Sequence, residues 1–311
     1  MPDRTSILVL GAGELGMSIL RSLSKRVSEH SNTDLTVLLR PSTIASSDPA
    51  KRRDIVELQS LGVKILAGDL VEKSTTALAS LFRDYQVVIG CTGFVTGPRI
   101  LLKQAQAVLD AGVKRFIPWQ FGVDYDIIGR GSAQDLFDEQ LDVRDLLRSQ
   151  DRTEWVIIST GMFTSFLFDP SFGVVDLANN VVRALGSWDT AVTVTASEDI
   201  GELTAEILFA EPRIVNRVVY TAGDTITYRR LADIIDSELN SKVQRVEWSV
   251  PLLKEELAHD PENKLKKYRL VFAEGRGVSW DLKQTFNAQH GINVKDVEHW
   301  IRENRPDRKT R

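Results

Sequence analysis

The chain has 311 residues, of which 42% are hydrophobic and 26% are charged, and its net charge at pH 7 is −4. This composition is typical of a globular protein with a sizeable core and excludes a disordered chain, a coiled coil and collagen. The acidic balance argues against a general nucleic-acid surface. The single cysteine, Cys91, excludes an intramolecular disulfide, and the four histidines show no spacing typical of metal ligands. We therefore predict no metal site.

No apolar run reaches the ~18 residues that a membrane span needs. The first residues lack the long apolar region of a signal peptide. We expect a soluble, cytoplasmic protein that binds neither membrane nor nucleic acid, as a monomer or a homodimer.

Short apolar runs alternate with helical patterns in the first half of the chain. The patterns predict strands at 7–10, 35–39, 63–67, 87–89, 115–118 and 154–159, with helices between them. Continuous apolar strands separated by helices are typical of a parallel sheet covered on both faces. The predicted fold class is therefore α/β, a doubly wound parallel (Rossmann) sheet.

The pattern loosens after residue 161, where helices are expected at 199–209, 228–239 and 295–311. We interpret residues 1–160 as the sheet domain and residues 161–311 as mainly a smaller C-terminal lobe for substrate, with segments that return to the sheet.

The segment after the first predicted strand, residues 11–16, fits the pattern G-x-G-x-x-G. It follows a strand and opens a helix, which is the context expected of a dinucleotide-binding turn. Gly11 permits the tight turn, Gly13 lets the backbone approach a pyrophosphate, and Gly16 lets the helix pack close to the sheet. The helix N-terminus adds amide donors for the anion.

The second predicted strand ends at Arg40, where an NAD-specific site normally carries an acidic residue. Arg40 instead offers a planar fork for a 2′-phosphate, with Ser42 and Lys51 as helpers. The cofactor that we predict is therefore NADPH/NADP+. Asp69, after the third strand, either holds the adenine edge or only caps a turn.

These residues, together with the segments 61–64, 68–70, 112–118, 121–122 and 198–201, resemble the NmrA-like and isoflavone-reductase-like group of atypical short-chain dehydrogenases. A narrower resemblance is to fungal proteins of secondary metabolism. The resemblance implies an NADPH-dependent reductase that acts on aromatic or phenolic small molecules at conjugated or benzylic carbons.

The resemblance also implies which positions hold the cofactor and the substrate. The adenosine half and pyrophosphate would contact Gly11, Gly13, Glu14, Leu15, Gly16, Arg40 and Lys51. The residues that follow the fourth and fifth strands would line the cleft and the nicotinamide: Thr92, Gly93, Phe94, Trp119, Gln120 and Phe121. After the sixth strand, Gly161, Met162 and Phe163 would face nicotinamide and substrate.

The sequence departs from the family at the expected acid. Plant reductases carry a lysine in the helix after the fifth strand, and that position is Gln140 in this chain. Glutamine can hold a ribose hydroxyl but cannot cycle a proton. Substitutes are Asp124, Tyr125 and, more remotely, His259, and each of these side chains also has a purely structural interpretation.

Several aromatic side chains lie at or near the carboxyl ends of predicted strands, where open α/β sheets bind ligands. Trp119, Tyr125, Phe163 and Phe166 are the candidates for contact with a flat aromatic substrate. The alternative is that most of these rings belong to the core of the lobe.

The leading hypothesis is an NADPH-dependent reductase of an aromatic or polyketide-like small molecule, with hydride transfer to a conjugated or benzylic carbon or a carbonyl. One alternative is a regulator that senses NADP(H) without turnover, which the missing lysine favours. Another is a redox-neutral isomerase or lyase on the same fold. A reductase should oxidise NADPH when given its substrate, whereas a sensor should discriminate NADP+ from NADPH by binding alone.

Overall fold

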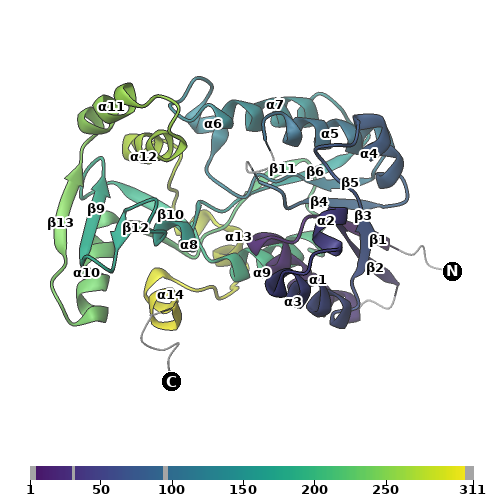
Figure 1. Ribbon diagram of the computed structural model, residues 1–311, viewed down its shortest axis with the longest axis horizontal. Coiled ribbons are helices and arrows are strands. Elements are labelled where there is room, and N and C mark those ends of the chain that lie inside the picture. The colour runs from purple at the N-terminus through teal and green to yellow at the C-terminus, as the bar shows by residue number, and fades with distance from the viewer. Residues whose placement is uncertain (1–4, 30–31, 94–96, 305–311) are drawn as a thin grey trace. The chain divides into compact units, whose positions relative to one another are not determined.

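The computed structural model describes residues 5–29, 32–93 and 97–304, which form two compact units that interleave along the sequence (Figure 1). Unit 1 consists of Met1–Gln120, Glu139–Ile158 and Ile200–Val219. Unit 2 consists of Phe121–Asp138, Ser159–Asp199 and Tyr220–Arg311. The chain passes between the units next to the boundary expected near residue 160, and it also does so at four other points.

Unit 1 is built on one seven-stranded sheet. Its strands are β1 (Thr5–Leu10), β2 (Thr33–Leu39), β3 (Lys64–Ala67), β4 (Val87–Gly90), β5 (Arg115–Ile117), β6 (Glu154–Ser159) and β11 (Arg217–Tyr220). Their order is β11-β6-β5-β4-β1-β2-β3, and every pairing from β3 to β6 is parallel. From β3 to β6 this is the strand order of the dinucleotide-binding fold. The predicted doubly wound parallel sheet is confirmed.

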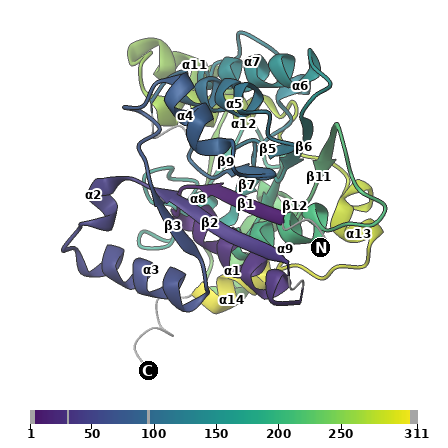
Figure 2. The same cartoon turned by 90° about the vertical axis from the view of Figure 1, so that its right-hand side faces the viewer.

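Helices cover both faces of this sheet (Figure 2). One face carries α1 (Glu14–Glu29), α3 (Pro49–Ser60) and α9 (Ser197–Leu208), and the other carries α4 (Thr75–Phe82), α5 (Ile100–Ala111) and α7 (Leu136–Arg148). A short helix, α2 (Pro41–Ile44), follows β2 directly. All four side chains of the Ile7–Leu10 run are completely buried, as expected of a central strand covered on both faces.

Local sequence signals set the ends of these elements. Asp48 caps α3 by accepting hydrogen bonds from the amides of Ala50 and Lys51. Gly112 ends α5 in the left-handed conformation, with φ of 69°. Because α5 ends at this glycine, the chain can turn and begin β5 at Arg115.

A buried arginine, the first residue of β5, binds this strand to the end of α9 and to the segment that follows it. Arg115 donates to the carbonyl oxygens of Leu208 and Ile214 at 2.8 Å each. Burial lowers the pKa of its guanidinium to about 10. These contacts attach β5, the strand that leads to Trp119 and Gln120, to the last residue of α9 and to Ile214.

Unit 2 contains two three-stranded sheets, ordered β12-β10-β7 and β13-β9-β8. Their strands are β7 (Met162–Phe163), β8 (Val175–Asp176), β9 (Val181–Leu185), β10 (Ala191–Thr195), β12 (Asp224–Thr227) and β13 (Gln244–Trp248). The helices of this unit are α6 (Tyr125–Ile128), α8 (Thr164–Leu167), α10 (Tyr228–Leu239), α11 (Val250–His259), α12 (Lys264–Glu274), η2 (Leu282–Gln284), α13 (Phe286–Gln289) and α14 (Val297–Asn304).

Three observations bear on the elements expected from the sequence. The helix expected at 295–311 is α14, which ends at Asn304, and the residues after it lie outside the described chain. The strand β11 returns from this half of the sequence to the sheet of unit 1. Within the described ranges, no helix has the length and apolar character needed to cross a membrane.

Candidate cofactor and substrate site

In the glycine turn of unit 1, an added side chain would clash with neighbouring atoms at two of the three glycines and would have free space at the third. Gly11 has a φ of 101°, which favours glycine, and a Cβ there would lie 2.8 Å from Cγ2 of Thr92. A Cβ on Gly16 would lie 2.3 Å from the carbonyl oxygen of Gly11. Around Gly13, by contrast, a Cβ would meet no described atom within 4 Å. The turn therefore leaves space where a pyrophosphate would approach the backbone.

The next two residues open α1. Glu14 is exposed, whereas the side chain of Leu15 is buried in the core with 4% of its surface accessible. Any contact of Leu15 with an anion would therefore use its backbone amide, which lies in the first turn of the helix. The roles of both residues in binding stay predictions.

The basic residues after β2 lie on exposed helix starts. Arg40 directly precedes α2, Ser42 lies in α2, and Lys51 lies in the first turn of α3. Among the described residues, the Arg40 guanidinium has no hydrogen-bonding or ion-pair partner. An exposed donor fork without a protein partner suits a phosphate ligand.

Asp69 has a clear local structural role. Its Oδ1 accepts hydrogen bonds from the amides of Val71 and Glu72, at 2.8 and 3.2 Å. This is the turn-capping role that was one of the two expected, and a contact with adenine stays a prediction.

The loop after β4 and the end of β5 pack together within unit 1. A Cβ on Gly93 would lie 2.7 Å from Cζ2 of Trp119, so the indole lies directly against the Gly93 backbone. Thr92 Oγ1 accepts a hydrogen bond of 2.8 Å from Gln104 Nε2. Trp119 is partly buried against the core of unit 1. Phe94 lies outside the described residues.

Behind Trp119, three polar side chains form a buried network. Arg144 Nε donates to Gln120 Oε1 at 2.7 Å, and Gln120 Nε2 donates to the backbone oxygen of Gln140 at 2.8 Å. Gln140 Nε2 donates to the backbone oxygen of Trp119 at 3.1 Å. All three side chains have 0% exposure. Gln140 Oε1 has no hydrogen-bonding partner among the described residues.

Asp124 and Tyr125 belong to unit 2 and are both buried. Asp124 is the N-cap of α6 through its Oδ1, and its Oδ2 accepts a 2.6 Å hydrogen bond from the Tyr220 hydroxyl. Tyr125 packs edge-on against Phe137 with ring centroids 5.0 Å apart, and its hydroxyl lies beside Gly122. Phe121 is also buried, with 3% exposure. These contacts match the structural interpretation of each residue, and a catalytic role for Asp124 or Tyr125 stays a prediction.

The residues expected after β6 also lie in unit 2. Gly161 approaches β10 so closely that a Cβ would lie 2.1 Å from the backbone oxygen of Thr193. Met162 is buried in β7, whereas Phe163 is half-buried at the start of α8. Phe166 stacks on Phe172 at 4.5 Å. Phe163 is therefore better placed than Met162 to offer a side chain to a ligand.

The surroundings of two further residues, His259 and Cys91, do not favour a catalytic role. His259 is exposed at the end of α11, where its Nδ1 lies 2.8 Å from the backbone oxygen of Glu255. Burial raises the pKa of the Cys91 thiol far above its usual range, so this side chain stays protonated.

Sequence reasoning missed Arg144, Tyr220 and Tyr268. Tyr268 of α12 lies edge-on to both Phe137 and Phe166, with centroids 5.8 Å apart in each case. Arg144 lies one helical turn after Gln140, and this spacing is the signal that would have placed both side chains on one face.

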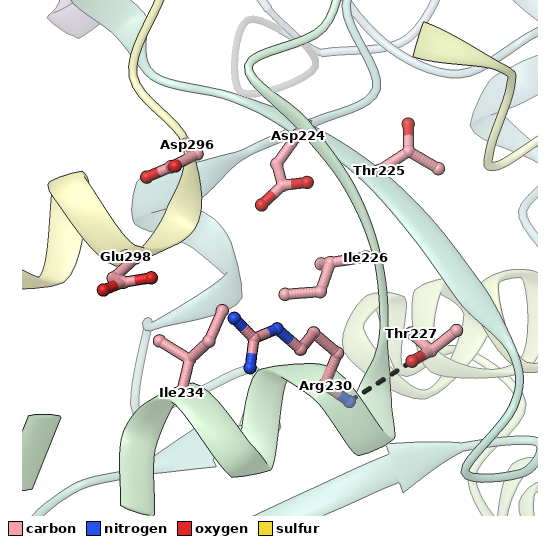
Figure 3. A pocket seen from close by; sticks show the side chains of 8 residues that line it. All are labelled: Asp224, Thr225, Ile226, Thr227, Arg230, Ile234, Asp296 and Glu298. Atoms are coloured by element: carbon pink, nitrogen blue, oxygen red, sulfur yellow. Dashed lines mark hydrogen bonds between the residues drawn. The ribbon is translucent and has the colours of Figure 1, made fainter. Parts of the chain in front are cut away.

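Unit 2 also has a pocket of about 330 Å³, lined by Asp224, Thr225, Ile226, Thr227, Arg230, Ile234, Asp296 and Glu298 (Figure 3). Asp296 Oδ1 accepts a 2.7 Å hydrogen bond from the His299 amide, and Asp224 Oδ2 lies 3.4 Å from the Val297 amide. These two carboxylates therefore accept hydrogen bonds from backbone amides in the first turn of α14. Among the described residues, no group of histidine, cysteine and carboxylate side chains is arranged to hold a metal ion.

A model of the NmrA-like family matches residues 3–300. The chain belongs to the NmrA-like family. It is 47% identical to an NmrA-like family domain-containing oxidoreductase of the fungus Gibberella moniliformis, over 96% of this chain and 97% of that protein. It is 26% identical to phenylcoumaran benzylic ether reductase 1 of Arabidopsis thaliana, over 96% of each chain. The resemblance that the sequence motifs carried is thus confirmed.

A solved structure shares the fold over nearly the whole chain. The binary complex of leucoanthocyanidin reductase with NADPH from Vitis vinifera superposes with a TM-score of 0.79 and 18% identity. The match covers 96% of this chain and 98% of that chain. At this identity the likeness shows a common fold.

Proposed function

We propose that this NmrA-like protein is an NADPH-dependent reductase of an aromatic or phenolic small molecule. The observation that carries the proposal is the glycine turn, in which Gly11 and Gly16 are closed by their neighbours while Gly13 faces open space. A turn that only joined a strand to a helix would not need a glycine at the open position. A pyrophosphate that approaches the backbone would explain why a glycine is present at this position.

The residues present fit NADPH better than NADH. The amides at the start of α1 would hold the pyrophosphate, and Arg40, with Ser42 and Lys51, would hold the 2′-phosphate. Thr92 and Gly93 follow β4, which pairs with β1, and Trp119 follows β5, which pairs with β4; these residues would line the nicotinamide side. When bound, the nicotinamide supplies a hydride.

The chain's own residues provide orientation rather than a strong acid. Gln140 occupies the lysine position and cannot release a proton. Asp124 is committed to the cap of α6 and to Tyr220. A substrate such as an aromatic enone or a quinone methide suits this arrangement, because its extended π system carries the negative charge until solvent supplies a proton.

The relatives support the same class of reaction. One relative is named an oxidoreductase and another a reductase of a phenylcoumaran benzylic ether. The structural neighbour from Vitis vinifera was solved with NADPH. Trp119 in unit 1 and Phe163 in unit 2 are each only partly buried, so each ring keeps some surface that could contact a flat ligand.

Calorimetric titration of the purified chain with NADPH, NADH and NADP+ tests the cofactor assignment. We expect NADPH to bind at least about tenfold more tightly than NADH, a difference of about 1.4 kcal/mol. A panel of aromatic enones would then be assayed for NADPH oxidation at 340 nm. Failure to bind any of the three nucleotides would overturn the proposal.

Gln140 also favours a second candidate, a sensor that binds NADP(H) without turnover. Such a sensor would prefer one oxidation state of the nucleotide by binding alone. A strong preference for NADP+ over NADPH, with no oxidation of NADPH by any substrate in the panel, would select the sensor over the reductase.

A further inference from the structure

The chemistry of their partners fixes the orientation of both glutamine amides behind Trp119. A guanidinium has only donors, so the atom of Gln120 that faces Arg144 Nε must be the oxygen. A backbone carbonyl only accepts, so the atom of Gln120 that faces the Gln140 oxygen must be the nitrogen. Flipping the Gln120 amide would oppose two donors at one end and two acceptors at the other. Arg144 therefore determines which way Gln120 points.

The same reasoning applies to Gln140. Its Nε2 faces the backbone oxygen of Trp119, so the other atom of this amide is the acceptor Oε1. This oxygen is buried and has no hydrogen-bonding partner among the described residues. A buried polar atom without a partner is unfavourable, and a bound group that donates a hydrogen bond removes that penalty.

The position of the network in the sheet indicates which part of a dinucleotide it would meet. Trp119 and Gln120 follow β5, which is separated from β1 by β4, whereas Arg40 follows β2 on the other side of β1. A dinucleotide binds across the carboxyl ends of the strands, with its two halves on opposite sides of β1. If Arg40 meets the adenosine half, the network lies on the side of the nicotinamide riboside.

We propose that Arg144 and Gln120 are positioning residues that fix the backbone of α7 at Gln140, so that the Gln140 side chain can accept a hydrogen bond from a hydroxyl of the nicotinamide riboside. The inference rests on the proposed function, because it assumes that NADPH binds. Arg144 acts through Gln120 and touches neither cofactor nor substrate. The buried arginine orients the uncharged amide of Gln120, and it does not replace the missing lysine as an acid.

Two nucleotides distinguish this role from general loss of structure. NADPH carries the nicotinamide riboside, whereas adenosine 2′,5′-bisphosphate lacks it but keeps the groups that Arg40 would bind. The informative variant is Gln120→Glu, whose carboxylate retains the partner of Arg144 but cannot donate to the backbone oxygen of Gln140. We expect it to fold, to bind NADPH roughly tenfold more weakly, and to bind the bisphosphate unchanged.

A second pair of variants tests the origin of the effect. Arg144→Met should weaken NADPH binding by a similar factor, and the exposed residue in the last turn of the same helix provides the control Arg148→Met, which should have no effect. Should Arg144→Met fail to fold, Gln120→Glu and Gln140→Met still test the proposal. In the Gln140→Met background, Gln120→Glu should cause no further loss of NADPH affinity, because Gln120 contacts the backbone of Gln140 and would affect NADPH binding only through the Gln140 side chain.

Each outcome either supports or overturns the inference. An equal loss of affinity for both nucleotides would show that the network only supports the fold of unit 1. Additive losses in the double variant would show that Gln120 does not act through Gln140. Bisphosphate binding without any gain from the nicotinamide riboside would overturn this inference but leave Arg40 intact, whereas binding of neither nucleotide would overturn the proposed function itself.

Discussion

Gly16 lies so close to Gly11 that a Cβ on Gly16 would stand 2.3 Å from the Gly11 carbonyl oxygen. That oxygen belongs to the backbone of the turn and cannot move aside without shifting the end of β1. Gly13, only three residues earlier, faces open space. Two glycines of one motif therefore serve different purposes: one permits packing, and the other leaves room.

Alanine substitutions separate these purposes. Gly16→Ala should destabilise the chain by about 1–3 kcal/mol or more, because the added methyl overpacks a rigid contact. Gly13→Ala should leave the unfolding midpoint nearly unchanged but weaken NADPH binding strongly. Urea unfolding and calorimetry on both variants provide the comparison. A Gly13→Ala protein with native NADPH affinity would contradict the assignment of the open space to the pyrophosphate.

Arg40 should determine the preference for the phosphorylated cofactor. Removing one charge-assisted contact in Arg40→Ala should weaken NADPH binding by about tenfold to a hundredfold, or about 1.4–2.8 kcal/mol. NADH binding should hardly change, because NADH lacks the 2′-phosphate. Arg83→Ala removes an exposed arginine at the end of α4 and serves as the control for net charge. Equal losses for the two nucleotides would contradict the assignment.

The sheet of unit 1 could be predicted because its strands are continuous apolar runs separated by helical patterns. In β1 the residues Ile7–Leu10 are all completely buried, and such a run has few alternatives. The strands β7 and β8 in unit 2 have only two residues each, and β7 pairs with β10, about thirty residues later in the chain. No local pattern marks strands of this length.

The glycine turn and Arg40 could be recognised because their signals are local. The network around Gln140 could not, because Arg144 lies in a helix with many charged residues and is a residue type that is rarely buried. Its burial depends on Gln120, which is 24 positions away in the sequence. A contact at that distance becomes visible only when β5 and α7 are placed in the fold.

The hydroxyl of Tyr220 should matter for the stability of unit 2. It donates at 2.6 Å to Asp124, whose side chain is 3% exposed, so Tyr220→Phe removes a donor from a buried carboxylate. We expect a loss of about 1–3 kcal/mol in the free energy of unfolding. Tyr85→Phe is the matched control, since the Tyr85 hydroxyl makes no hydrogen bond within the described ranges. Equal unfolding midpoints for the two variants would show that the Asp124 contact contributes nothing.

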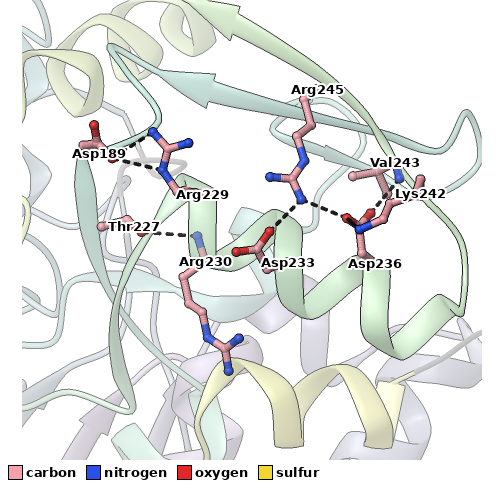
Figure 4. Close-up of polar contacts among 9 residues, drawn as sticks. All are labelled: Asp189, Thr227, Arg229, Arg230, Asp233, Asp236, Lys242, Val243 and Arg245. Carbon is pink, nitrogen blue, oxygen red and sulfur yellow. Dashed lines mark hydrogen bonds and ion pairs between the residues drawn. The ribbon is translucent and has the colours of Figure 1, made fainter.

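Two aspartates of unit 2 should respond to pH with opposite signs. Asp236 of α10 is 7% exposed and accepts from the Val243 amide at 2.7 Å, from Lys242 at 3.1 Å and from Arg245 at 2.8 Å (Figure 4). Burial alone would raise the pKa of Asp236, but these hydrogen bonds outweigh it, and the pKa lies below its usual 3.8. For Asp224, burial raises the pKa above 3.8, and the nearby Asp296 carboxylate adds to the rise (Figure 3).

The sign of each effect follows from proton linkage. A carboxyl whose pKa is lowered by folding contributes stability above its unfolded pKa, and that stability is lost as the pH falls through the folded value. Asp236→Asn should therefore lower the free energy of unfolding by roughly 1–3 kcal/mol at pH 7, and this difference from the native chain should shrink only below about pH 4.

For Asp224 the folded state binds the proton more tightly, so ionisation at neutral pH destabilises the fold. Asp224→Asn should accordingly stabilise the chain at pH 7, and this gain should shrink as the pH falls through the raised pKa. Urea unfolding of both variants between pH 7 and pH 3.5 measures the two trends, and effects of the same sign at pH 7 would contradict the opposite environments of these two carboxylates.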